Sequence, residues 1–131
     1  MFRALFAEYF NHKGLYRFVG QLLRLKHDIP NFEFELIVVT TEQAYMENIK
    51  KSINFCGGSH SDVKFVNGPI DNFLKAVEGS DVNFDYIEFN GGVNIKHNYR
   101  GILSMFREML APEGVIGLTA YVSNNMVDEI R

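Results

Sequence analysis

The chain has 131 residues, of which 47% are hydrophobic and 22% are charged, and its formal net charge is −3. These values are typical of one globular domain with a single core, spanning residues 1–131, and they give no electrostatic signal for nucleic-acid binding. The single cysteine excludes an intrachain disulfide and is typical of a reducing compartment. No run reaches about 18 apolar residues, so we predict neither a signal peptide nor a membrane span and expect a cytoplasmic protein.

The first segment of the chain is compatible with two structures. Residues 4–10 are mostly apolar, which suits a strand at the centre of a sheet. The apolar residues from Leu5 to Phe10 also have helical spacing. If the segment is a strand, Glu8 must lie at its carboxyl end, because an unpaired buried carboxylate is costly. The residues of this segment leave both structures open.

Helices and strands alternate through the next part of the chain. Apolar residues at helical spacing predict a helix over Tyr16–Leu25, which Pro30 and Asn31 terminate. Phe32–Val39 ends in four consecutive aliphatic residues, which is typical of a strand in a buried parallel sheet. We expect Thr40 to cap a second helix, with Gln43 completing a capping box.

A short strand and a short helix follow a polar loop. The loop, Gly57–Asp62, lacks the length and the composition of a domain linker. Val63–Val66 is predicted to be a strand and Asn72–Val77 a helix, with Phe73 and Leu74 on its inner side.

The stretch from Phe84 to Tyr121 gives the clearest pattern. Phe84–Phe89 is an apolar and aromatic run that favours a strand, and Asn90-Gly91-Gly92 ends it. Apolar residues then recur at helical spacing over Tyr99–Leu110, before Pro112 and Gly114. Val115–Tyr121 is predicted to be a second strand. A strand, a crossover helix and a strand imply parallel pairing with a right-handed connection.

This stretch resembles class I S-adenosylmethionine-dependent methyltransferases. The resemblance is carried by Phe-Asp-Tyr-Ile at 84–87, the polar-glycine turn, the helix and the Ala-Pro-Glu-Gly turn at 111–114. It covers Val63–Tyr121, more loosely Phe34–Phe55, and little before that. It implies a three-layer α/β Rossmann-like domain with a mostly parallel sheet of about five strands, in the order 3-2-1-4-5. The strand is thereby favoured for residues 4–10, at the centre of this sheet.

The resemblance also implies a cofactor, S-adenosylmethionine, at the carboxyl ends of the strands, and a methyl acceptor that the residues do not identify. Gly14 is what this chain retains of the glycine loop that follows the first strand in the family. Thr40 stands where the family has an acidic residue for the ribose, so Glu42 is the nearest substitute. Asp71 follows the third strand as the candidate contact to the adenine. The alternatives are a first-turn helix carboxylate for Glu42 and an N-cap for Asp71.

Asn90 and Gly91 would face the methyl group and the acceptor, and Asn90 is the candidate for catalysis. The alternative is a plain turn before two glycines. His97 in the same loop would serve as a base toward a hydroxyl acceptor, or is a solvated histidine. Cys56 has the pattern of a packed side chain, and the other histidines lack metal-ligand spacing, so we predict no metal site.

Two functions from different classes remain open on this evidence. The chain is either a methyltransferase, shortened and with a weakened cofactor site, or a non-catalytic methyltransferase-like module that serves a protein partner. The single glycine and the missing acidic residue favour the module. A third interpretation is that the chain is a fragment of a longer enzyme.

Overall fold

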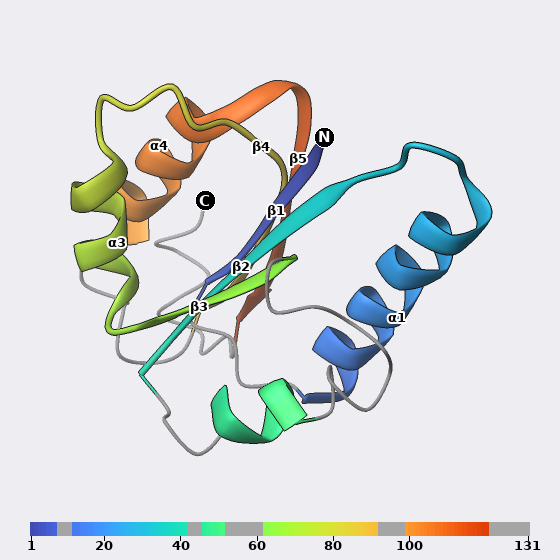
Figure 1. Cartoon of the computed structure of the whole chain (residues 1–131). Coiled ribbons are helices and arrows are strands. Elements are labelled where there is room, and N and C mark those ends of the chain that lie inside the picture. The colour runs from blue at the N-terminus through green and yellow to red at the C-terminus, as the bar shows by residue number, and fades with distance from the viewer. Residues whose placement is uncertain (8–11, 42–45, 52–61, 92–98, 121–131) are drawn as a thin grey trace.

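The computed structural model describes residues 1–7, 12–41, 46–51, 62–91 and 99–120. These residues form a three-layer arrangement in which one sheet lies between helices (Figure 1). Residues 46–51 are also helical. The strands are β1 (Phe2–Ala7), β2 (Phe34–Thr40), β3 (Val63–Asn67), β4 (Phe84–Gly91) and β5 (Leu110–Ala120), and the named helices are α1 (His12–Asp28), α3 (Ile70–Val77) and α4 (Tyr99–Met109).

The five strands are parallel and lie in the order β3-β2-β1-β4-β5. The predicted fold class and strand order are therefore confirmed. β1 is the central strand: its Leu5 is in register with Ile37 of β2 on one side and with Ile87 of β4 on the other. The first segment is thus a strand over Phe2–Ala7 and not a helix, because two neighbouring strands supply partners for its backbone.

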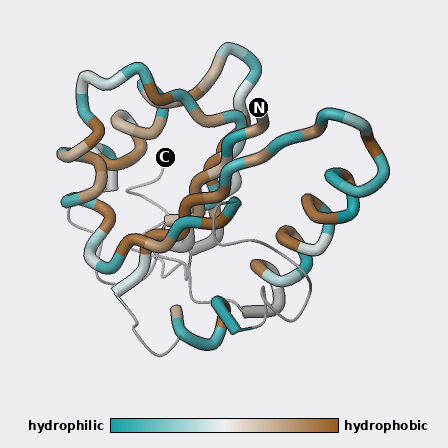
Figure 2. Tube along the Cα trace, in the orientation of Figure 1, coloured by the Kyte–Doolittle hydropathy of each residue, from teal (hydrophilic) through white to brown (hydrophobic). Residues whose placement is uncertain are grey.

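Alternate residues of the central strand serve two separate cores. Ala4 and Phe6 pack in the core beneath α1, whereas Leu5 and Ala7 pack in the core beneath α3 and α4. All four side chains are at most 3% exposed. A strand that is buried on both faces has apolar residues at every position, which explains the continuous apolar run in the sequence. Figure 2 shows this concentration of hydrophobic residues along the strands.

The predicted elements differ from the structure mainly at their ends. α1 begins at His12, four residues before the predicted start at Tyr16. Thr40, predicted as a helix cap, is the last residue of β2 and is fully buried, and Gln43 lies outside the described residues. α4 ends at Met109, as the prediction of a stop before Pro112 requires.

β5 begins earlier than the sequence indicates. The strand runs from Leu110, so Pro112 and Gly114 lie within it and not in a turn before it. The register with β4 shifts here: Phe84 is paired with Leu110 and Tyr86 with Val115, so the additional residues of β5 form an irregularity in the pairing. Proline is tolerated at such an irregularity, and among the described residues β5 is an edge strand.

Candidate functional site

The carboxyl ends of the five strands meet at one edge of the sheet, where the topology also changes direction. After β1 the chain crosses one face through α1 and builds the sheet outward through β2 and β3. β4 then returns to the other side of β1, and α4 covers the opposite face (Figure 1). In an open parallel sheet, the crevice between two strands whose connections leave in opposite directions is the usual place for a ligand. Here that crevice lies between β1 and β4.

The strand register gives this edge a stepped shape. Ala7, the last residue of β1, is in register with Val39 of β2 and with Phe89 of β4. β2 continues for one residue beyond this level, and β4 continues for two, Asn90 and Gly91. Among the described residues, β1 therefore ends one residue before the end of β2 and two residues before the end of β4.

The predicted glycine loop is corrected by the structure. Gly14 lies in the first turn of α1, two residues after its first residue His12, and so belongs to the helix and not to a loop. The first turn of α1 contains no acidic residue. The amino end of a helix carries partial positive charge, so this turn is suited to an anionic group of a ligand.

For Asp71, predicted as a contact to the adenine, the alternative of an N-cap is wrong. The N-cap of α3 is Pro69, which makes no side-chain capping bond, and Asp71 lies inside the first turn, half-buried. α3 follows β3, which is separated from β4 by β2 and β1. Three strand spacings amount to about 14 Å, so only an elongated ligand would reach both Asp71 and the end of β4.

The other predicted site residues are partly outside the described structure. Asn90 and Gly91 are the last two residues of β4, and their backbones are in register with Thr119 and Ala120 of β5. Glu42, together with Glu8, which follows Ala7 in the sequence, lies outside the described residues. The same holds for Cys56 and for His97 in the loop after β4.

The end of β2 is fixed by a bond that the sequence did not indicate. Thr40 is fully buried, and its carbonyl oxygen accepts a hydrogen bond of 3.0 Å from the backbone N–H of Gly68. Gly68 has a φ of 144°, a conformation that glycine adopts readily, and it follows Asn67, the last residue of β3. The ends of β2 and β3 are thereby held together beside the crevice.

A polar pair on β4 lies on the same face of the sheet as α1. The hydroxyl of Tyr86 donates a hydrogen bond to Oε2 of Glu88, and both side chains are partly buried. The Tyr86 ring stacks on Phe18 of α1 at 5.5 Å between centroids. This pair was not predicted from the sequence, although the alternation of Tyr86 and Glu88 with Ile87 and Phe89 is the signal that would have found it.

No metal centre is evident within the described ranges, where no three side chains of His, Cys, Asp or Glu gather closely enough to hold an ion. Within the same ranges, no helix is long and apolar enough to cross a membrane.

Comparisons with known proteins show a relationship of fold. No protein-family model matches the chain, and no curated protein matches it. Among solved structures, an S-adenosylmethionine-dependent methyltransferase from Agrobacterium tumefaciens superposes with a TM-score of 0.71 at 15% sequence identity. The match covers 94% of this chain but only 39% of the bacterial protein. The chain therefore has the fold of a methyltransferase and spans well under half of the length of that neighbour.

Proposed function

We propose that this chain is a methyltransferase domain that binds S-adenosylmethionine at the carboxyl edge of its sheet, between β1 and β4. The observation that carries the proposal is the change of topology between β1 and β4, where β4 extends two residues, Asn90 and Gly91, beyond the register partner of Ala7. The likeness of fold to a methyltransferase, over 94% of the chain, supports the same placement. The methyl acceptor is not identified.

Methyl transfer requires little from the protein besides positioning. The cofactor supplies a methyl group on a positively charged sulfur, and an in-line displacement by a nucleophile releases S-adenosylhomocysteine. Such a reaction gains most of its acceleration from the orientation of the two reactants. In our proposal the first turn of α1, with Gly14, holds the carboxylate of the cofactor, and Asn90 makes one hydrogen bond to the cofactor and orients the acceptor.

We expect weak cofactor binding. Gly14 is one glycine, and it lies inside a helix rather than in a loop, so the backbone of this chain offers less close approach than a loop of several glycines would. At the end of β2 the side chain is that of buried Thr40, so the ribose hydroxyls depend on Glu42 for a carboxylate. Asp71 and Glu8 are further candidate contacts of this site.

Calorimetric titration of the purified chain with S-adenosylhomocysteine tests the proposal. We expect saturable binding with a Kd weaker than the low micromolar range. The Asn90→Ala substitution should weaken binding about 2- to 12-fold, which corresponds to one hydrogen bond of ~0.5–1.5 kcal/mol. Asn83→Ala is the matched control, because Asn83 is exposed and precedes β4 at the opposite edge of the sheet. Equal effects of the two substitutions would argue against a site at the end of β4.

The competing function is a non-catalytic module with a methyltransferase fold, and the retention of only Gly14 from the expected glycine loop favours it. Absence of any binding of S-adenosylhomocysteine at millimolar concentration would support the module and refute the proposed cofactor site. Low-micromolar binding would instead show that the carboxylate of Glu42 contributes strongly. In that case Glu42→Ala should weaken binding about 10- to 150-fold, the equivalent of ~1.5–3 kcal/mol for a charged hydrogen bond.

A further inference from the structure

A pocket lies between α3 and α4, on the side of the molecule away from the crevice. Its lining comes from the last turns of both helices and from the segment that leads into β4. Val82 precedes the first residue of β4, and Met109 precedes the first residue of β5, so the pocket lies at the amino edge of the sheet. Its volume is about 220 Å³. Nothing in the proposed methyl transfer uses this edge.

Apolar side chains from both helices and from the segment before β4 form part of the pocket's lining, beside polar ones. Leu74 is fully buried and Met109 is 9% exposed, while Val82 and Met105 are half-buried. The turn after α3 is held by a hydrogen bond of 3.0 Å from the N–H of Ser80 to the carbonyl oxygen of Val77. A second bond, of 3.4 Å, runs from the N–H of Val82 to Oγ of Ser80. These bonds hold the turn that forms one side of the pocket.

The rim of the pocket is acidic. Glu78 is the C-cap of α3, and Glu108 lies in the last turn of α4. Both side chains are exposed, and neither takes part in an ion pair or a hydrogen bond within the described part of the chain. The carboxyl ends of the two helices add partial negative charge. The basic residues of these last turns, Lys75 and Arg107, are not among the lining residues.

The size of the pocket decides what kind of ligand it fits. Pockets that hold a whole small molecule usually measure about 300–1,000 Å³, and they enclose most of it. A pocket of about 220 Å³ is smaller, and it suits a single large apolar side chain that anchors a larger partner. Methionines such as Met105 and Met109 adapt their shape to different anchors.

We propose that this pocket docks a basic peptide segment of another protein. The segment inserts one large apolar side chain between Leu74 and Met105, and the lysine or arginine residues beside this anchor meet the carboxylates of Glu78 and Glu108. The apolar side chains of the lining supply the attraction for the anchor, and the acidic rim selects its neighbours by charge. This inference is independent of the cofactor site, because it concerns the opposite edge of the sheet.

Methyl-group NMR of the full chain, with ¹³C-labelled methionine, tests the inference. The probe is the peptide acetyl-Lys-Lys-Phe-Lys-Lys-amide. The chain has five methionines, of which Met105 and Met109 line the pocket and Met46 is buried and does not line it. We expect saturable shifts of the Met105 and Met109 signals with a Kd between about 0.1 and 10 mM, and no shift for Met46. Absence of saturable shifts at Met105 and Met109 would overturn the proposal.

Two sets of controls separate docking from general attraction between unlike charges. The double substitution of Glu78→Gln and Glu108→Gln should weaken peptide binding about 2- to 30-fold, since each exposed pair contributes a small amount. Glu33→Gln with Glu47→Gln removes the same charge from exposed positions outside the pocket, and should leave binding within about 2-fold. Equal losses in the two double variants would refute the docking site.

Two further ligands test whether binding needs a positive charge and whether it needs a peptide. The peptide acetyl-Glu-Glu-Phe-Glu-Glu-amide carries the same anchor with the opposite charge, so it should bind at least several-fold more weakly. Butylammonium chloride carries a cation without a peptide. If it bound to the pocket as tightly as the basic peptide, the pocket would be a small-molecule site and the proposal would fail.

Discussion

Two glycines of β5 provide a sharp test of the packing at the β4–β5 pair, because a methyl group added at each would meet different atoms. At Gly114 the new Cβ would lie 2.9 Å from the carbonyl oxygen of Phe84 and 3.0 Å from that of Ala111. At Gly117 it would meet the ends of side chains instead: the Tyr86 hydroxyl at 2.6 Å and Oε2 of Glu88. Backbone atoms in a paired strand move little, whereas side-chain ends rotate away.

The magnitudes follow from these contacts. Overpacking lowers the free energy of unfolding by up to about 3 kcal/mol. Replacing glycine by alanine raises it by about 0.4–1 kcal/mol, because the unfolded chain then has less conformational entropy. Gly114→Ala should therefore lower the free energy of unfolding by about 2–3 kcal/mol. Gly117→Ala should break the hydrogen bond between Tyr86 and Glu88, worth ~1.5–3 kcal/mol for a bond to a charged group, for a net loss of about 1–2 kcal/mol.

The assay is urea denaturation followed by far-ultraviolet circular dichroism, since the chain has no tryptophan to report by fluorescence. Each glycine variant is measured alone and together with Tyr86→Phe, which removes the hydroxyl and its bond. The cost of Gly117→Ala should fall by at least ~1 kcal/mol in that background, while the cost of Gly114→Ala should change by less than ~0.5 kcal/mol. An unchanged cost for Gly117→Ala would refute the assignment of its contact to Tyr86.

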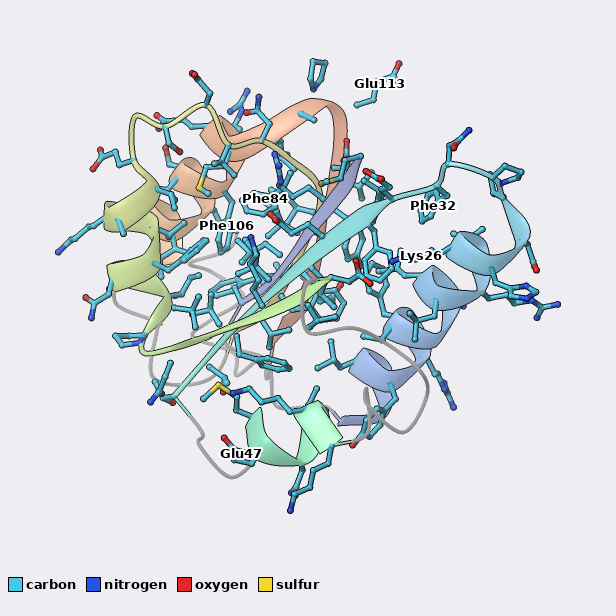
Figure 3. All side chains as sticks on the ribbon, viewed as in Figure 1. Lys26, Phe32, Glu47, Phe84, Phe106 and Glu113 are labelled. Atoms are coloured by element: carbon cyan, nitrogen blue, oxygen red, sulfur yellow. The ribbon has the colours of Figure 1, made fainter. Side chains whose placement is uncertain are left out.

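Two further predictions concern the core and an ion-pair ladder. Phe106, labelled in Figure 3, is fully buried. Its ring meets that of Phe89 edge to face at 5.1 Å between centroids, so Phe106→Ala should destabilise the chain by about 3–5 kcal/mol, and a loss below ~1 kcal/mol in a urea melt would contradict this packing. Glu35 on β2 forms ion pairs with Lys64 on β3 and with Arg3 on β1. The hydrogen bond from Lys64 is the largest cause that lowers the pKa of Glu35, and the positive charges of Lys64 and Arg3 lower it further, whereas burial acts in the opposite direction. A lowered pKa in the folded state means that Glu35 stabilises the fold above its unfolded pKa of about 4.3, and that this contribution is lost as the pH falls through the folded pKa. Glu35→Gln should therefore cost about 0.4–2 kcal/mol at pH 7 and flatten the loss of stability on acidification, and parallel pH profiles for the variant and the parent chain would contradict the assignment.

The type and order of the elements were predictable because they depend on neighbours along the chain. The switch from strand to helix spacing and back between Phe84 and Tyr121 predicts a parallel unit, and β4, α4 and β5 confirm it. The burial of Phe73 and Leu74 in α3 follows from the same periodicity. Apolar spacing reports which side of a segment will be buried, and burial is what stabilises these elements.

The predicted site was less certain, because a site combines groups that are distant in sequence. α1 begins about one turn earlier than predicted, so Gly14 lies in a helix and not in a loop. Pro69 is the N-cap of α3, which rules out the alternative of a cap for Asp71. The edge to which Asn90 and Gly91 belong was predicted correctly as the carboxyl end of β4. What their side chains bind remains a prediction.

The sequence by itself determined that this chain alternates strands and helices around a parallel sheet, since local apolar periodicity decides each element. Only the tertiary structure decided that residues 2–7 form the central strand, because their pattern fits a helix as well, and the hydrogen-bonding partners that select the strand come from β2 and β4. The pocket between α3 and α4 and the bond between Tyr86 and Glu88 likewise needed the fold, because they arise from packing across elements and faces that no spacing along the chain encodes.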